Sequence, residues 1–298
     1  MKKQTTPVNG KARSLGADAW HRFKKNRLAV VSLIILCLMI VIAFSTFVID
    51  WATDSSFYEA KVITQDLRRR VEPPSWEHPF GLDEFGRDML LRVIWGARYS
   101  LFMGMAAVLG ATLLGGFLGA VSGYYKLADG VIMRVMDILL AVPTILLATA
   151  IVAALGTSEV NLIMAILISQ TPTFARVVRA SVLTIKEQEY IEAARAMGAG
   201  DMHIIFRYII PNSLSPLIVQ CTMSVASAIL SIASLSFIGL GIQAPMPEWG
   251  AMLSNARTYI RDSWHITLIP GAAIMVTILM LNIIGDGLRD ALDPRLKN

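Results

Sequence analysis

The sequence predicts an all-α membrane protein with about six transmembrane helices, because of its composition, its long apolar blocks and the placement of its charges. Of the 298 residues, 55% are hydrophobic and only 16% are charged. The mean hydropathy of +0.57 is too high for a water-soluble domain. The apolar residues fall in blocks that are long enough to cross a hydrocarbon layer of about 30 Å as helices.

Six apolar blocks define the expected spans. They cover residues 28–49, 99–123, 135–156, 160–175, 214–241 and 266–284. The fourth block is short and contains Gln170 and Pro172. The first block is longer than the apolar part of a secretory signal and no small-residue cleavage site follows it, so we expect it to stay as an anchor.

The distribution of basic residues predicts the orientation. With the N-terminus inside, 18 of the 27 Lys and Arg residues lie in inner segments and 9 in outer ones, as the positive-inside rule requires. Both tails, 1–27 and 287–298, are therefore expected in the cytoplasm, with an interfacial helix within 14–27. Residues 50–98 form an extracytoplasmic loop. Its several arginines oppose this orientation, but long loops obey the rule weakly.

The overall charge and the few cysteines exclude several classes of function. A net charge of +5 is explained by basic residues beside the spans, where membrane lipid headgroups attract them, so no nucleic acid is expected. Cys37 and Cys221 lie in separate apolar blocks and the four histidines are scattered, which predicts neither a disulfide nor a metal site. The sequence has no GxxxxGK[ST] phosphate loop, so no cofactor is expected on this chain and the chain is expected to hydrolyse nothing.

Two spans carry small or polar residues on one helical face. Gly115, Gly119 and Gly123 form a GxxxGxxxG ridge that favours close helix packing. The fifth span has a polar stripe at helical spacing, and the fourth span has a smaller polar patch. The stripe comprises Gln220, Ser224, Ser227, Ser231 and Ser234, and the patch includes Gln170 and Thr173. Such residues either bond neighbouring helices or line a hydrated translocation path, and the sequence does not decide between the two.

Charged residues are nearly absent from the spans. Arg134 and Asp137 are three residues apart near the inner end of the third span, where a local ion pair is expected. No carboxylate falls at mid-membrane, which disfavours an ion-coupled carrier.

The longest cytoplasmic loop, 176–213, is expected to fold. Residues 187–197 are strong helix formers that end at Gly198 and Gly200. Asp201 is expected to cap a second helix, which Pro211 would interrupt. A helix, a glycine break and a capped helix make a rigid elbow that can pass movement from a soluble partner to the fourth and fifth spans.

The elbow carries a recognisable pattern. Glu192-Ala193-Ala194, Gly198 and Ile210-Pro211 resemble the EAA loop of importer-type ABC permeases, with departures at Tyr208 and Ile210 that keep apolar bulk. Four further segments resemble the C-type membrane subunit of dipeptide and oligopeptide (and nickel) permeases. They are residues 78–101, 133–148, 244–253 and 285–297.

The resemblance implies an importer-type ABC permease fold in the inner membrane of a bacterium, with a core at 99–286. The implied partners are a homologous second permease in a heterodimer, two cytoplasmic ATPases that hold ATP and Mg, and an extracytoplasmic solute-binding protein. The residues implied to couple to an ATPase are Glu189, Glu192, Ala193, Ala194, Gly198, Asp201 and Pro211. Asp83, Arg87 and Asp88 are expected either to contact the binding protein or to pin the outer loop against the spans.

The family implies import of di- or oligopeptides, with nickel complexes or glutathione as alternatives. An ion-coupled secondary transporter is a more distant alternative, which the folded elbow disfavours. An intramembrane enzyme would need a catalytic pair within the spans, which the sequence does not contain. A structural scaffold would leave the elbow and the polar stripe unexplained.

Overall fold

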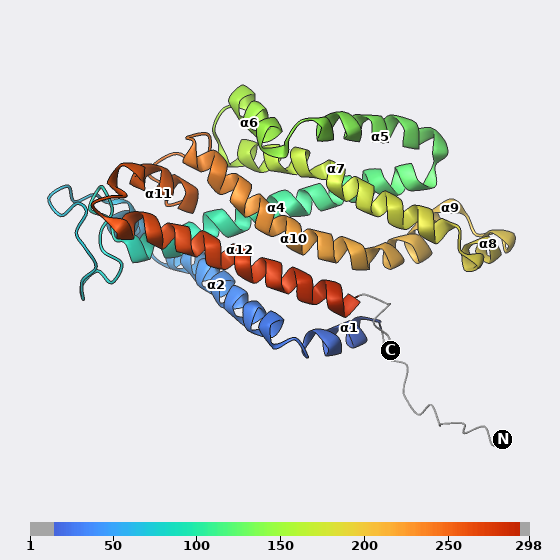
Figure 1. The fold of residues 1–298 in the computed structure, drawn as a ribbon, viewed down its shortest axis with the longest axis horizontal. Coiled ribbons are helices and arrows are strands. Elements are labelled where there is room, and N and C mark those ends of the chain that lie inside the picture. Colours follow the sequence, from blue (N-terminus) through green and yellow to red (C-terminus); the bar gives the residue numbers. More distant parts are fainter. Residues whose placement is uncertain (1–14, 293–298) are drawn as a thin grey trace, which may run out of the picture.

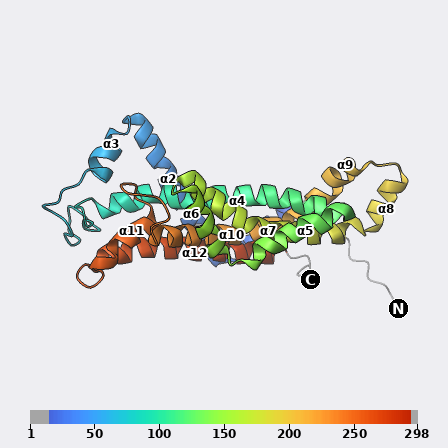
Figure 2. The same ribbon diagram turned by 90° about the horizontal axis from the view of Figure 1, so that it is seen from above.

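The computed structural model describes residues 15–292 and confirms the all-α fold. These residues form a long bundle whose main helices run roughly parallel (Figures 1 and 2). Within them the only β-type pairing is an isolated bridge between Leu82 and Asp88. The first 14 residues of the expected N-terminal tail and residues 293–298 of the expected C-terminal tail lie outside the described part.

Five helical runs are long and apolar enough to cross a membrane. They are α2 (Arg27–Ala52), α4 (Met89–Tyr124), α7 (Glu159–Lys186), the run Asp201–Phe237 and α12 (Trp264–Leu292). The run Asp201–Phe237 consists of α9 (Asp201–Ile204), a π-helical turn (Ile205–Ile209) and α10 (Ile210–Phe237). A sixth span is formed only if α5 (Lys126–Ala141) and α6 (Thr144–Leu155) count as one.

The third expected span, 135–156, is not one straight helix. α5 and α6 meet at a bend of 91°, because Pro143 lies between them. Proline disfavours the α conformation in the residue before it, and Val142 accordingly has φ −99° and ψ 129°. The first part of the block, which contains Asp137, is in α5, and the remainder, which has no charged residue, is in α6.

Several helices extend beyond the apolar blocks that predicted them. The amphipathic segment after Asp88 and the second span form one helix, α4, which Asp88 caps through its side chain. α7 continues to Lys186, into the expected cytoplasmic loop, and α12 continues to Leu292, past the expected boundary at 286. A helix whose last turns are polar can continue past the hydrocarbon layer into water, and its backbone hydrogen bonds stay intact.

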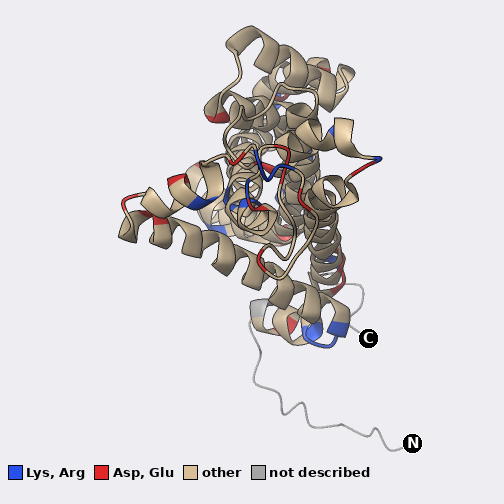
Figure 3. Cartoon of the chain, turned by 90° about the vertical axis from the view of Figure 1, so that its left-hand side faces the viewer, with Lys and Arg blue, Asp and Glu red and all other residues tan. Residues whose placement is uncertain are grey.

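The two ends of the bundle differ in character. α1 (Leu15–Phe23), α8 (Glu189–Ala196) and α9 lie at one end (Figure 1). The loop that follows α2 and the short α11 (Trp249–Ala256) lie at the opposite end. Figure 3 looks onto this second end and shows acidic and basic residues gathered in the loop.

The closest helix packing joins α4 to α7 through the glycine ridge. A Cβ atom on Gly115 would lie 2.5 Å from the carbonyl oxygen of Thr171, and one on Gly119 would lie 2.3 Å from that of Ala175. A Cβ on Gly123 would lie 2.7 Å from Val182. All three contacts are with α7, so the ridge allows two backbones to approach as small residues do in membranes.

We expect Gly119→Val to destabilise the protein by about 1–3 kcal/mol or more, because a side chain there must push α7 away from α4. Gly116→Val is the matched control, since a Cβ at Gly116 meets nothing within 4 Å. The unfolding temperature of the purified protein in detergent measures both variants. Equal losses would contradict the packing role, because they would reflect only the helix propensity of valine.

Candidate functional site

The expected coupling helix is present as α8, and Gly198 ends it. Gly198 has φ +85°, a left-handed conformation that glycine adopts without strain. Its N–H donates to the Arg195 carbonyl, and the N–H of Ala199 donates to that of Ala194, which is a Schellman cap. A Cβ on Gly198 would meet nothing within 4 Å. The glycine is therefore required by backbone conformation rather than by a close neighbour in this chain.

One face of α8 packs against the spans. Ile191 and Ala194 are buried, and Ile191 belongs to an apolar cluster with Val182, Ile204 and Ile209 from α7 and the run Asp201–Phe237. Ala194 therefore lies against this chain rather than on the outer surface. Of the two alanines expected to allow close approach of a partner, only Ala193 is exposed.

The other face of the elbow is open and more apolar than the sequence suggested. Glu189, Glu192 and Ala193 are exposed on α8. Next to them in the chain, Met197, Met202 and Phe206 are exposed to 81%, 67% and 68%. The four-residue spacing of Met202 and Phe206 could have indicated this surface, but an apolar pair on a short helix is just as typical of a buried face.

Asp201 and Pro211 have different roles from those expected. Gly200 is the N-cap of α9, and the Asp201 carboxylate instead accepts a hydrogen bond from the Tyr124 hydroxyl at the end of α4. Pro211 does not interrupt the helix, because it lies in the first turn of α10 directly after the π-helical turn. In a π-helix the hydrogen-bonding pattern shifts, so an adjacent proline is tolerated. The elbow is therefore continuous with the fifth span.

The polar stripe of α10 satisfies itself within its own helix. The hydroxyls of Ser227, Ser231 and Ser234 donate to backbone carbonyls three or four residues earlier, at 2.7–2.9 Å. Gln220 donates to the Ser224 hydroxyl at 3.0 Å. Within residues 15–292 none of these contacts joins two helices. Ser227 is exposed, Ser231 and Ser234 are half-buried and Ser224 is buried, so only part of the stripe is open.

The polar patch of α7 is divided between two environments. Gln170 is buried, and its Oε1 has no hydrogen-bond partner among the described residues. Thr173 is half-buried on the adjacent face. Gln170 is therefore enclosed within this chain, whereas Thr173 is accessible from outside it.

The ion pair expected between Arg134 and Asp137 does not form. Asp137 instead pairs with Arg176 of α7, with 2.6 Å between Oδ1 and Nη2. Arg179 of α7 forms a second pair, with two bonds of 2.6 and 2.7 Å to Asp129 of α5. The helix-to-helix pairs prevail because α5 packs along α7, which sequence spacing alone does not show.

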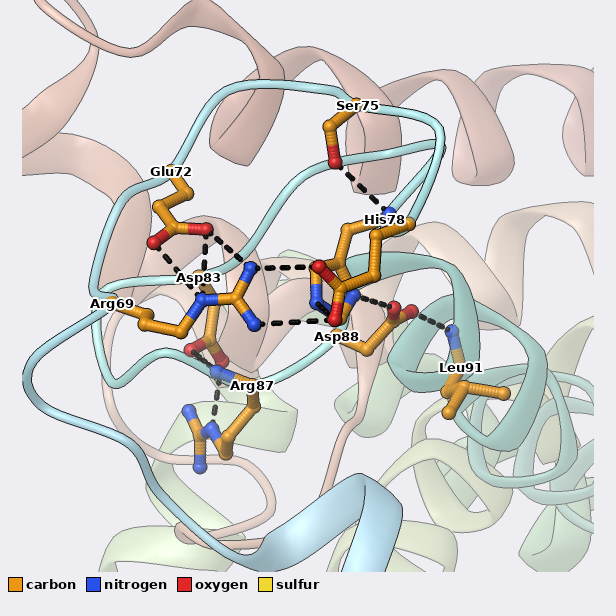
Figure 4. Close-up of polar contacts among 9 residues, drawn as sticks. Arg69, Glu72, Ser75, His78, Asp83, Arg87, Asp88 and Leu91 are labelled. Carbon is orange, nitrogen blue, oxygen red and sulfur yellow. Dashed lines mark hydrogen bonds and ion pairs between the residues drawn. The ribbon is translucent and has the colours of Figure 1, made fainter.

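The three residues proposed for the outer loop are held inside it (Figure 4). The side chains of Arg87 and Asp83 are 1% and 3% exposed, and Arg87 Nε lies 2.7 Å from Asp83 Oδ2. Asp88 accepts from the Leu91 N–H at 2.9 Å and contacts His78 Nδ1 at 2.7 Å. These contacts favour the role of pinning the loop over that of contacting a soluble protein.

Other buried polar residues at this end were missed by sequence reasoning. Arg92 Nη1 donates to the carbonyls of Val62 at 3.1 Å and Pro245 at 3.3 Å, which ties α4 to two loops. Glu248 is fully buried and caps α11, accepting from Gly250 and Ala251. Burial raises the pKa of the Glu248 carboxyl, against the lowering effect of these N–H donors. The partners are far apart in the chain, so spacing gave no signal.

No group of three or more His, Cys, Asp or Glu residues that could hold a metal ion occurs in the part of the chain that the structure describes.

Comparison with known proteins gives the same assignment as the elbow. Residues 111–298 match the family described as binding-protein-dependent transport system inner membrane component, and residues 14–74 match the N-terminal TM domain of oligopeptide transport permease C. The dipeptide transport system permease protein DppC of Alkalihalophilus pseudofirmus is 48% identical over 94% of this chain and 90% of its own. The glutathione transport system permease protein GsiD of Pectobacterium atrosepticum is 44% identical over 94% of this chain and 91% of its own.

Solved structures show the same fold. A chain of the MetNI methionine ABC transporter, in inward-facing conformations, aligns with a TM-score of 0.56 at 19% identity, over 69% of this chain and 98% of its own. A chain of an amino acid ABC transporter crystallised with histidines aligns with a TM-score of 0.52 at 17% identity, over 67% of this chain and 94% of its own. The chain is a member of the family of binding-protein-dependent transport system inner membrane components.

Proposed function

We propose that this chain is the permease subunit of a bacterial ATP-driven importer that carries di- or oligopeptides through the cytoplasmic membrane, and that it has no catalytic activity of its own. The single observation that carries the proposal is the elbow formed by α8 and α9, which is packed against two membrane-length helices and leaves an outer surface open. The names of the similar permeases support peptide cargo, and one of them, a glutathione permease, supports a small modified peptide as the alternative.

The elbow would couple to an ATPase through its exposed side. Glu189, Glu192 and Ala193, with the apolar side chains that follow them, offer a carboxylate anchor and an apolar contact. ATP and Mg would be bound by that partner. Two ATPases, a second and homologous permease, and an extracytoplasmic solute-binding protein complete the proposed assembly, with membrane lipid around it.

The ends of the bundle support an orientation with both termini in the cytoplasm. α1 and the end of α12 lie at the same end as the elbow (Figure 1). An elbow that meets a cytoplasmic ATPase therefore places both ends of the described chain on the cytoplasmic side. The opposite end, with its buried ion pairs, then faces outward toward the binding protein.

We expect Gly198→Val to release the ATPase from the complex, while Gly198→Asn keeps most of it. Both variants add a side chain in open space, but asparagine tolerates the left-handed conformation and valine does not. Co-purification from detergent-solubilised membranes, with ATP hydrolysis assayed on the product, measures the difference. Equal loss with both variants would show that bulk at this position, and not the shape of the elbow, matters.

Cargo is tested by uptake of radiolabelled trialanine and glutathione into cells that express the whole transporter. We expect ATP-dependent uptake of at least one of them, abolished by Ala193→Arg, which places a charged side chain on the exposed face of α8. Ala52→Arg, at the exposed last residue of α2 at the opposite end of the bundle, is the control. Uptake that persists without ATP on an ion gradient would replace this function by secondary transport.

A further inference from the structure

The ion pair Asp137–Arg176 is unusually exposed for charges on membrane-length helices. Arg176 Nη2 lies 2.6 Å from Asp137 Oδ1, and the two side chains are 53% and 55% exposed. The neighbouring pair on the same two helices, Arg179–Asp129, is only 32% and 27% exposed and is bidentate. The two pairs share helices and chemistry but differ in accessibility.

The pair joins α5 to α7, and Arg176 lies toward the end of α7 that leads to the elbow. Arg176 is about 25 Å along the helix from Glu159, at 1.5 Å per residue. α7 contacts α5 on one side and α10 on the other (Figure 1). Charges that face hydrocarbon cost several kcal/mol, so an open ion pair on a membrane-length helix faces protein, water or the headgroup layer.

The surface around the pair mixes polar and apolar side chains, since Val135 and Ile138 of α5 are exposed beside it. Arg134 is exposed one turn before Asp137 and has no ion-pair partner within residues 15–292. Thr173 lies one turn from Arg176 on the same side of α7. The next residue, Val177, lines a cavity of about 690 Å³ together with residues of α10 that include Gln220. The exposed charges of α5 and α7 are therefore one residue along α7 from a cavity that Gln220 of α10 also lines.

We propose that Arg134, Asp137 and Arg176 line the translocation route and receive the charged ends of peptide cargo. An unblocked peptide carries one ammonium group and one carboxylate, which match Asp137 and the two guanidinium groups. An exposed ion pair has a net stability of only about 0–1 kcal/mol, so cargo can replace either partner at little cost. This inference rests on the proposed import of peptides and adds the recognition chemistry of the route.

A charge-neutralisation cycle separates this role from a structural one. The variants are Asp137→Asn, Arg176→Gln and both together, measured as uptake of whichever of trialanine and glutathione the wild type imports. If cargo uses the charges, we expect each single variant to lower uptake about tenfold, and the double variant to be at least as low. A purely structural pair would behave oppositely, because removing both charges leaves none unpaired.

The matched control is the same cycle at Asp129 and Arg179. There we expect the double variant to recover to within about twofold of the wild type, as a structural pair does. Recovery of the Asp137→Asn/Arg176→Gln variant to the same level would overturn the proposal. If the wild type imports neither peptide, the proposed function itself fails. That outcome is distinguishable from failure of this inference alone, in which the wild type imports a peptide and the double variant recovers.

Water access is tested independently of cargo. The variant Arg176→Cys also carries Cys37→Ala and Cys221→Ala, so that it has a single cysteine. Membranes that contain the whole transporter with this variant are treated with a membrane-impermeant charged thiol reagent. We expect labelling of Cys at 176 and none in the variant Ile34→Cys, an exposed position on the apolar helix α2. A positively charged reagent should also restore uptake, and a negatively charged one should not. Labelling as slow as that of the α2 variant would place the pair against lipid or a partner and overturn the proposal.

Discussion

The contact between the backbones of α4 and α7 is the constraint on which the other helix positions depend. Gly115, Gly119 and Gly123 present no side chain to α7, so backbone carbonyl groups of α7 lie directly against the backbone of α4. Lys186 then donates from the end of α7 to the Gly123 carbonyl at 2.8 Å. Because α7 also packs against α5, α6 and α10, its position relative to α4 fixes the frame in which the elbow and the polar surface are held.

The elbow is built to move with that frame and not independently of it. Ile191 on its inner face shares an apolar cluster with residues of α7 and of the run that leads into α10. Tyr124 at the end of α4 is bonded to Asp201. A force on α8 therefore reaches three membrane-length helices through packed side chains, and a two-state rocking of those helices would in turn move the elbow.

Charges are used differently at the two ends of the bundle. At the end opposite the elbow Asp83, Arg87 and Glu248 are buried and hydrogen-bonded, an arrangement in which loss of one partner leaves a costly unpaired charge. Such groups fix a loop but are closed to a soluble ligand. Nearer the elbow Asp137 and Arg176 are open, and open pairs can exchange partners. In the proposed role of this pair, accessibility, more than charge itself, is what separates it from the structural residues.

Apolar blocks and glycine spacing were enough to predict the fold class, most of the spans and the elbow, because these depend on local composition. Whether a proline breaks its helix was not predictable from local composition. Pro143 breaks a span, whereas Pro172 and Pro216 lie inside continuous helices. Whether the freed carbonyl finds another partner, and whether neighbouring helices hold the segment straight, depends on tertiary packing.

Contacts of the candidate site residues were predicted wrongly wherever a residue near in sequence competed with a partner far away in sequence. Spacing predicted that Asp137 would meet Arg134, but α7 brings Arg176 closer. Capping preference predicted Asp201 at the N-cap, but the Tyr124 hydroxyl provides another partner for its carboxylate. The serines of α10 share helical spacing, yet Ser224 is buried and the hydroxyls of Ser227, Ser231 and Ser234 bond to their own helix. Few free hydroxyls are therefore left on α10, which is why the proposed recognition of cargo rests on the charges of α5 and α7.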